Sequence, residues 1–389
     1  MKEDWVVKKL GDVCTIERGG SPRPINAYLT DSVDGVNWIK IGDACEGSKY
    51  ITSTKERIKP EGVKKSRMVH KGDFILSNSM SFGRPYILGI DGCIHDGWLV
   101  IHDKNNVFDK SYLYYYLGSP NIYREFQRLA VGGVVNNLNS ELVRNVKVAI
   151  PPLPEQSRIV EELDLLSNII EKKRQQLSEL DNLAQSIFYD MFGDPVTNEK
   201  GWEVKKLGDI SYIGLGFTHT PEYVDEGVPF LSVKDISKGE ICWDNIKHVS
   251  KEEYDSAPKG AKPKKGDIMF CRVGTMGKPV IVKTDQPFCT FVSVGYLHLL
   301  NDNVINVYVK YWMLSYAFEL QVESNVKGLA IKNLNTGWLK TFDIQIPPLS
   351  LQQLFAQKIE AIEKQKALIK QSIAETEELF NSRMHYYFS

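Results

Sequence analysis

The sequence predicts a mixed α/β fold in which one unit is present twice, each copy a β-rich globular domain followed by a long α-helix. Three observations lead to this prediction. An ordered set of motifs recurs at an almost constant offset, short apolar segments separated by turn residues fill the first part of each copy, and a heptad pattern fills the second part. A chain of 389 residues is also longer than one ordinary domain.

Five motifs carry the duplication, and they recur in the same order 194–197 residues further along the chain. They are WVVKKLGD at 5–12 and WEVKKLGD at 202–209, KGDFIL at 71–76 and KGDIMF at 265–270, GRP at 83–85 and GKP at 277–279, NLN at 137–139 and 333–335, and IPPL at 150–153 and 346–349. The shared order and spacing indicate one structural unit repeated. The predicted globular domains are residues 1–150 and 196–346, and the predicted helical regions are 151–195 and 347–389.

The pattern within each globular domain predicts short strands and one longer helix. In the first copy the strands are expected at 36–41, 73–77, 86–90 and 98–101, where Gly, Asp and Asn separate the apolar segments. Aromatic residues recur at three- and four-residue spacing at 111–129 in the first copy and at 307–322 in the second, so one helix is expected in each.

A heptad seam follows each double proline and predicts two long helices. The apolar positions are Ile159, Leu163, Leu166, Ile170, Leu177, Leu180, Ala184, Ile187 and Met191 in the first copy, and Phe355, Ile359, Ile362, Ile369, Ile373, Phe380 and Tyr387 in the second. Lys173 and Lys366 each interrupt the seam once. We expect the two helices to pair antiparallel as a coiled-coil spacer, with helices of another subunit as the alternative partners.

Charge is unevenly distributed along the chain. The formal net charge of −1 and the isoelectric point near 6.7 do not by themselves indicate a nucleic-acid binder. Residues 1–150, however, have a net charge of +4 and residues 151–195 a net charge of −5. This distribution favours an anionic partner for the first globular domain and a protein partner for the helix that follows it.

The sequence predicts a cytoplasmic protein without a metal or a cofactor. The mean hydropathy is −0.27, and no apolar run reaches the length needed to cross a membrane. The segment MKEDWVVKKL lacks the apolar core of a signal peptide. The six cysteines include no CxxC pair, and Cys93 with His95 supplies at most half of a zinc site.

No catalytic constellation stands out, so we expect no enzymatic activity in this chain. Asp194, Glu203 and Lys205 mimic the acid pair and lysine of a metal-dependent nuclease. The repeat, however, has Val6 at the position of Glu203, which makes the glutamate incidental.

Taken together, the duplicated W-x-V-K-K-L-G-D, K-G-D, N-L-N and I-P-P-L motifs resemble those of type I restriction–modification specificity subunits (HsdS). The resemblance covers nearly the whole chain; one departure is Ser350-Leu351 in place of Pro154-Glu155. It implies two target-recognition domains, each reading one half of a bipartite asymmetric site in double-stranded DNA. It also implies that the helices set the spacing and dock two methyltransferase subunits, that partners carry methylation and cleavage, and that restriction subunits are possible further partners.

Three segments in each copy are candidates for DNA contact, because they combine basic, hydroxyl and amide side chains with glycines. The loop after the K-G-D strand offers Asn78, Ser79, Ser81 and Arg84 in copy one and Arg272, Thr275 and Lys278 in copy two. The segment around N-L-N offers Asn136, Asn137, Lys327 and Lys332, with Asn139 and Asn335 expected to be turn or cap residues. The early loops offer Arg18, Arg23, His219 and Thr220. The alternative is a protein-interaction scaffold with two binding domains on a coiled-coil spacer.

Overall fold

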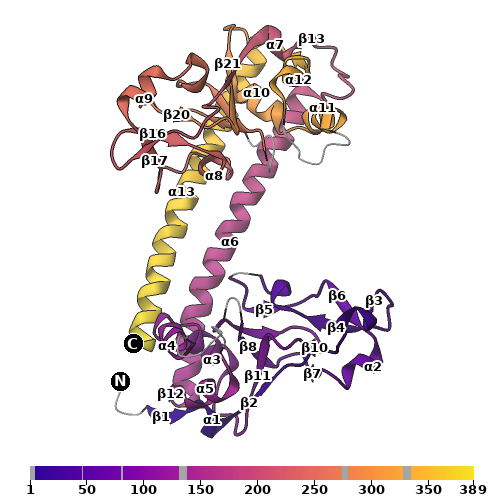
Figure 1. Ribbon diagram of the computed structural model, residues 1–389, viewed down its shortest axis with the longest axis vertical. Coiled ribbons are helices and arrows are strands. Elements are labelled where there is room, and N and C mark those ends of the chain that lie inside the picture. The colour runs from indigo at the N-terminus through magenta and orange to yellow at the C-terminus, as the bar shows by residue number, and fades with distance from the viewer. Residues whose placement is uncertain (1–4, 46, 80–81, 131–137, 274–278, 327–333) are drawn as a thin grey trace. The chain divides into compact units, whose positions relative to one another are not determined.

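The computed structural model describes residues 5–45, 47–79, 82–130, 138–273, 279–326 and 334–389. They fold into two compact units, one formed by Met1–Lys173 with Ser372–Ser389 and the other by Arg174–Gln371. Each unit contains one globular domain and part of each of two long helices, α6 (Leu153–Phe192) and α13 (Leu349–Phe388) (Figure 1).

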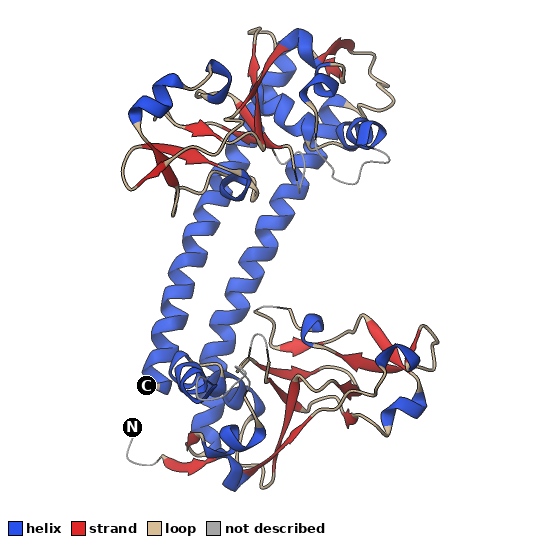
Figure 2. Ribbon diagram, in the orientation of Figure 1, coloured by secondary structure: helices blue, strands red, loops and turns tan. Residues whose placement is uncertain are grey.

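Sheets dominate the described part of the first globular domain (Figure 2). One sheet has the order β2 (Cys14–Arg18), β11 (Trp98–Asp103), β8 (Phe74–Ser77), β9 (Pro85–Leu88) and β5 (Tyr50–Ile51). A second has the order β3 (Leu29–Thr30), β6 (Glu56–Ile58), β4 (Val36–Ile39), β10 (Gly92–Ile94) and β7 (Arg67–Val69). The helical segments are α1 (Leu10–Val13), η1 (Ile25–Ala27), η2 (Ile41–Asp43), α2 (Pro60–Val63), α3 (Lys110–Leu117), α4 (Pro120–Ala130) and α5 (Ser140–Asn145).

The second globular domain repeats this arrangement with shorter sheets. One sheet has the order β14 (Ser211–Leu215), β21 (Val294–Leu299), β18 (Ile268–Cys271) and β19 (Val280–Ile281). The other has the order β15 (Tyr223–Val224), β17 (Lys247–Val249), β16 (Val228–Leu231) and β20 (Cys289–Thr290). The helical segments are α7 (Leu207–Ile210), α8 (Val233–Ile236), α9 (Lys251–Ser256), η3 (Lys259–Ala261), α10 (Asn306–Met313), α11 (Tyr316–Val326) and α12 (Thr336–Lys340). The predicted fold class, a duplicated mixed α/β unit with long helices, is confirmed.

The duplicated motifs form the same local structures in both units. The first motif forms β1 (Val6–Lys9) and β13 (Glu203–Lys206), which pair antiparallel with β12 (Lys147–Ile150) and β22 (Asp343–Ile346), directly before the double prolines. In the K-G-D motif, Asp73 accepts a hydrogen bond from the His70 amide at 2.8 Å and Asp267 one from the Lys264 amide at 2.7 Å. This motif is therefore a turn.

Asn139 and Asn335 are helix caps, as predicted. The Asn139 side chain accepts from the Leu142 amide at 2.8 Å and begins α5. The Asn335 side chain accepts from the Gly337 amide at 2.7 Å and begins α12. The amide groups of the first turn have no partner within a helix, so this hydrogen bond stabilises the start of each helix.

The single helices expected at 111–129 and 307–322 are each two helices, so this prediction is wrong. In the first unit α3 ends at Leu117 and α4 begins at Pro120, a residue without an amide hydrogen to donate inside a helix. In the second unit α10 ends at Met313 and α11 begins at Tyr316, and the Ser315 hydroxyl between them donates to the Trp312 carbonyl at 2.6 Å.

Within each unit α6 and α13 pair antiparallel, as the heptad pattern predicted. In the first unit Glu162 forms an ion pair with Arg383 at 2.7 Å, and Lys173 lies opposite Ser372. In the second unit Asp181 forms an ion pair with Lys366 at 2.6 Å. As residue numbers rise along α6, those of the contacts fall along α13. Both lysines that interrupt the seam therefore have polar partners across it.

A large hydrophobic core in each unit joins the globular domain to the helix pair. In the first unit it includes Leu99, Phe126, Ile159, Leu163 and Phe388, and in the second Phe188, Phe192, Leu297, Trp312 and Phe355. Burial of this apolar surface is the main favourable contribution to folding. No helix among the described residues is both long and apolar enough to cross a membrane.

Candidate nucleic-acid interface

In the first unit two of the predicted DNA-contacting segments meet at the turn formed by His95, Asp96 and Gly97, directly after β10. From the early loop, the Arg18 Nε donates to the Asp96 carbonyl at 2.8 Å, and the Arg23 Nη2 lies 3.5 Å from the Asp96 carboxylate. From the loop after β8, the Asn78 side chain donates to the same carbonyl at 3.1 Å. The turn therefore holds together segments that are far apart in the sequence.

Asp96 is the polar centre of this junction. The Ser21 hydroxyl donates to its carboxylate at 2.7 Å. Burial by itself would raise the pKa of Asp96, but the hydrogen bond from Ser21 and the nearby His95 and Arg18 side chains outweigh it and hold the pKa below its ordinary value. Asp96 is therefore ionised at neutral pH and keeps the early loop, with its two arginines, attached to the turn.

The predicted contact residues of the first unit differ in how exposed they are. Arg23 is 81% exposed at its side chain, whereas Asn78 is 2% exposed as a residue and is bonded to the turn through both its side chain and its amide. Ser79 and Arg84 are half-buried, and the Arg84 amide donates to the Ser77 hydroxyl at 2.9 Å. Among the contact residues of this unit that the structure describes, Arg18 and Arg23 are thus the most accessible, and Asn78 mainly holds the loop in place.

The second unit forms the same junction with different side chains. Arg272 stands in the place of Asn78, and its guanidinium donates to the Val292 carbonyl at 2.7 Å and to the Leu334 carbonyl at 3.0 Å. Burial lowers the pKa of Arg272 from its ordinary value. Two of its nitrogen atoms are therefore engaged in bracing the turn after β20 and the N-L-N segment, rather than free to contact a ligand.

The N-L-N motif is attached to this junction in both units. The Leu138 amide donates to the Asn78 carbonyl at 2.9 Å, and the Leu334 amide donates to the Arg272 carbonyl at the same distance. Leu138 and Leu334 are almost fully buried and attach the start of α5 or α12 to the end of β8 or β18. The repetition of the motif is explained by this backbone connection.

The early loop of the second unit is exposed. His219 lies with its Nε2 3.1 Å from a Glu253 carboxylate oxygen and edge-on to the Phe217 ring, and Thr220 has an exposed side chain. Seven other predicted contact residues lie outside the described residues; they are Ser81, Asn136, Asn137, Thr275, Lys278, Lys327 and Lys332.

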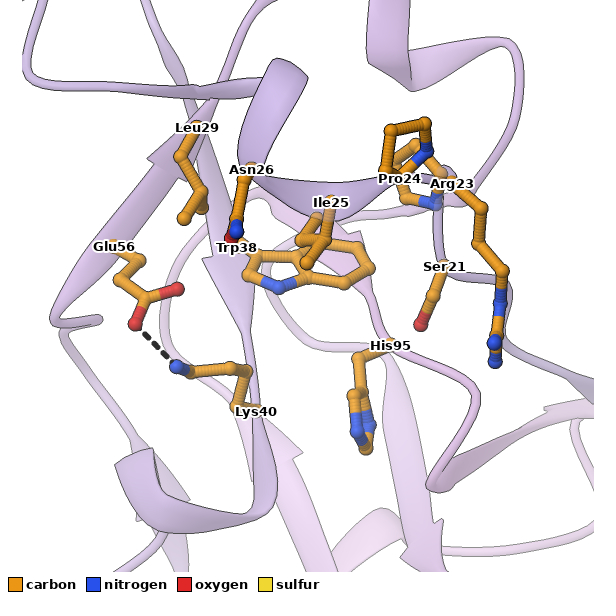
Figure 3. Close-up of a pocket in the computed structure, with 11 residues that line it drawn as sticks. Ser21, Arg23, Pro24, Ile25, Asn26, Leu29, Trp38, Lys40, Glu56 and His95 are labelled. Atoms are coloured by element: carbon orange, nitrogen blue, oxygen red, sulfur yellow. Dashed lines mark hydrogen bonds and ion pairs between the residues drawn. The ribbon is translucent and has the colours of Figure 1, made fainter.

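Several polar residues near the junction were not identified from the sequence. They line a pocket of about 710 Å³ in the first globular domain and include Lys40, Glu56 and His95, which lie around the ring of Trp38 (Figure 3). The nearest sequence signal was His95, considered only as a metal ligand with Cys93. Cys93 is buried beside Met68, with the two sulfur atoms 3.9 Å apart, and burial raises the pKa of its thiol.

Neither a metal centre nor a nuclease site is assembled by the residues that the structure describes. Among them no three His, Cys, Asp or Glu side chains are placed to share an ion. The Asp194 side chain accepts from the Val196 amide at 2.9 Å in a turn, and Glu203 is an exposed residue of β13. Asp194 therefore has a structural role in its turn, and Glu203 lies on the exposed surface of its strand.

Comparison with known proteins identifies the family. A family model described as the type I restriction modification DNA specificity domain matches residues 2–182 and again residues 199–378. The type I restriction enzyme MjaIX specificity subunit of Methanocaldococcus jannaschii is 26% identical over 381 residues, covering 91% of this chain and 85% of that protein. The EcoBI specificity subunit of Escherichia coli is 21% identical over 387 residues, covering 92% and 79%.

Solved structures share the fold. A chain from a study of complex assembly and conformational transition of the type I R-M system has a TM-score of 0.58 and 19% identity, covering 100% of this chain and 98% of that one. The S subunit of a type I restriction–modification system from M. genitalium has a TM-score of 0.53 and 13% identity, covering 99% and 97%. Because the family model matches twice and spans most of the chain, the protein belongs to the family of type I restriction–modification DNA specificity proteins.

Proposed function

We propose that this chain is the specificity subunit of a type I restriction–modification complex and that its two globular domains read the two halves of a bipartite, asymmetric target in double-stranded DNA. Residues 1–150 would form the first target-recognition domain and residues 196–346 the second. Residues 151–195 and 347–389 would set the spacing of the half-sites and dock two methyltransferase subunits. Methylation and cleavage would belong to partner subunits, and the complex would work in the cytoplasm, where it meets DNA.

One observation carries this proposal: the two units keep the same backbone junction but change its side chains. In both, the loop after the K-G-D strand is hydrogen-bonded to the turn after β10 or β20 and to the N-L-N motif. The exposed side chains that the early loop presents are Arg18 and Arg23 in one unit and His219 and Thr220 in the other. A common scaffold with different side chains is what reading two different base sequences requires, because base edges differ in their donors and acceptors.

A salt-dependent gel shift with the cognate methyltransferase tests whether the complex binds DNA. If the specificity subunit recruits DNA, the complex should shift a duplex, and its affinity should fall roughly a thousandfold or more between about 50 and 200 mM salt, since phosphate contacts release counterions. The control is the methyltransferase without this chain. A shift that this chain leaves unchanged would favour the protein-interaction scaffold, for which the family comparisons offer no support.

A further inference from the structure

The pocket in the first globular domain lies beside the junction described above and shares Ser21, Arg23 and His95 with it. Its volume of about 710 Å³ is within the range of pockets that bind small molecules, roughly 300–1,000 Å³. The early loop with η1, β3, β4 with the following Lys40, β6 and the turn after β10 all contribute to its lining (Figure 3). The side chains around it belong to three chemical kinds, which together restrict the ligand.

The first kind is aromatic and apolar. Ile25 and Leu29 are half-buried, and Trp38, against which they pack, is 1% exposed, so at most an edge of its ring meets a ligand. The His95 ring stands edge-on to the Trp38 ring, with the ring centres 6.1 Å apart. Such a wall favours a flat, unsaturated ring, because aromatic rings gain both apolar burial and oriented edge or face contacts there.

The second kind supplies hydrogen-bond donors and acceptors next to each other. Lys40 and Glu56 form an ion pair, and their side chains are 34% and 36% exposed, so both retain atoms that can reach a ligand. The Gly97 amide donates to the His95 Nδ1 at 2.8 Å, which leaves Nε2 to carry the proton of the neutral ring. Burial lowers the pKa of His95, so the neutral form prevails at pH 7. A ring edge that contains both donors and acceptors matches this set.

The third kind is cationic and lies at the rim. The Arg23 side chain is 81% exposed, and Arg18 is held next to it by its bond to the Asp96 carbonyl. Arg67 supports Arg18 by donating from its Nε to the Arg18 carbonyl at 2.8 Å. Guanidinium groups bind phosphate through parallel hydrogen bonds, so an anionic group attached to the flat ring would be favoured at this rim.

The second globular domain fills the corresponding place with aromatic side chains. Trp38 of β4 pairs with Cys93 of β10, and Phe230 of β16 pairs with Cys289 of β20. Phe230 therefore corresponds to Trp38. Phe291 corresponds to His95, because each stands two residues after the paired cysteine. The ring centres of Phe217 and Phe230 are 5.7 Å apart, and those of Phe230 and Phe291 are 6.2 Å apart. The polar pocket therefore results from the side chains of the first domain and not from the shared fold.

We propose that this pocket binds a nucleotide, with the base against Ile25, Leu29 and the His95 ring, the base edge at Lys40 and Glu56, and the phosphate at Arg23. A flat ring, a mixed donor and acceptor edge and an anion occur together in this class of ligand. The nucleotide is either one residue of the first half-site, turned out of the duplex, or a free mononucleotide. The first source rests on the proposed function, whereas the second does not.

The test for the DNA source uses the full chain assembled with its methyltransferase on the mapped target. 2-Aminopurine is placed at each position of the first half-site in turn, and its fluorescence rises where a base leaves the stack. The variants are His95→Phe, which introduces the residue that the second domain has at this position, and Glu56→Gln. We expect a rise in 2-aminopurine fluorescence at one position, and both variants should reduce this rise at least tenfold. Fluorescence rises that result from the methyltransferase should persist in both variants.

The test for the free source is calorimetric titration of the full chain with each of the four deoxynucleoside monophosphates. Binding that His95→Phe and Glu56→Gln weaken at least tenfold supports this source. The matched controls are His70→Phe and Glu61→Gln, which change exposed residues of the same domain. Thermal melting of each variant checks that the domain remains folded.

The proposal is overturned if the pocket variants and the controls behave alike in both tests. If a bipartite site is methylated while no signal depends on the pocket, only this proposal fails. If the complex does not bind duplex DNA at all, the proposed function fails, and the mononucleotide titration still decides whether the pocket binds a nucleotide.

Discussion

Replacing Phe355 by alanine is expected to destabilise the second unit by about 3–5 kcal/mol. Phe355 is fully buried, and its ring lies 5.2 Å from the rings of Phe192 and Tyr311 and 5.9 Å from the ring of Phe188, measured between centres. The side chain thus connects α13 with α6 and α10. Alanine would remove these contacts and leave a cavity between three helices, which a packed core fills only in part.

The measurement is a urea titration of the free energy of unfolding, followed by circular dichroism. The matched control is Leu354→Ala, since Leu354 is adjacent in α13 and 47% exposed, and we expect it to change stability by less than about 0.5 kcal/mol. Equal effects of the two substitutions would contradict the assignment of this helix face to the core.

Replacing Gly19 or Gly216 by alanine is expected to disturb the junction of its own unit. A β-carbon on Gly19 would lie 2.2 Å from the His95 carbonyl oxygen, and one on Gly216 would lie 2.0 Å from the Thr290 carbonyl oxygen. Both obstacles are backbone atoms, so the early loop would have to move away from the turn. We expect a loss of about 1–3 kcal/mol in stability and weaker recognition of one half-site only.

Methylation assays on duplexes that vary one half-site at a time, combined with thermal melting, measure both effects. Gly19→Ala should impair reading of the first half-site and Gly216→Ala that of the second. Gly42→Ala is the control, because a β-carbon there meets no atom within 4 Å. If Gly42→Ala impairs methylation as much as the other two, the importance of the close approach is refuted.

Features that depend on local patterns were predictable from the sequence. The heptad seam led to the long helices, and the asparagines after the N-L-N leucines led to the caps of α5 and α12. The antiparallel pairing predicted from the shared heptad seams is also observed within each unit, where Lys173 and Lys366 have polar partners on the other helix.

Features that depend on contacts between distant segments were not predictable. The centre of the first junction is Asp96, which Ser21 reaches from 75 residues away, and no local pattern marks that pair. Asn78 was expected to contact DNA because of its residue type, whereas its burial depends on the turn packed against it. Pro120 marks the start of α4 in the sequence, but the aromatic periodicity on both sides of it predicted one continuous helix.

One repeated signal was available and was overlooked. Gln156 and Gln352 occupy equivalent positions after the double prolines and are fully buried. The Gln156 side chain accepts a hydrogen bond from the Asp109 amide, just before α3, at 2.8 Å. The Gln352 side chain accepts one from the Ile305 amide, just before α10, at 2.9 Å. A polar residue repeated at equal spacing in an apolar helix indicates a buried connection between elements, because an unpaired buried amide would be costly.

Exchanging residues 1–150 for the corresponding domain of another family member, followed by sequencing of methylated sites in cells that express the hybrid with its methyltransferase, tests most directly whether the two domains read DNA independently. We expect one half of the methylated sequence to change completely and the other half, with the spacing, to remain as in the parent. A change in both halves, or in neither, would contradict the account.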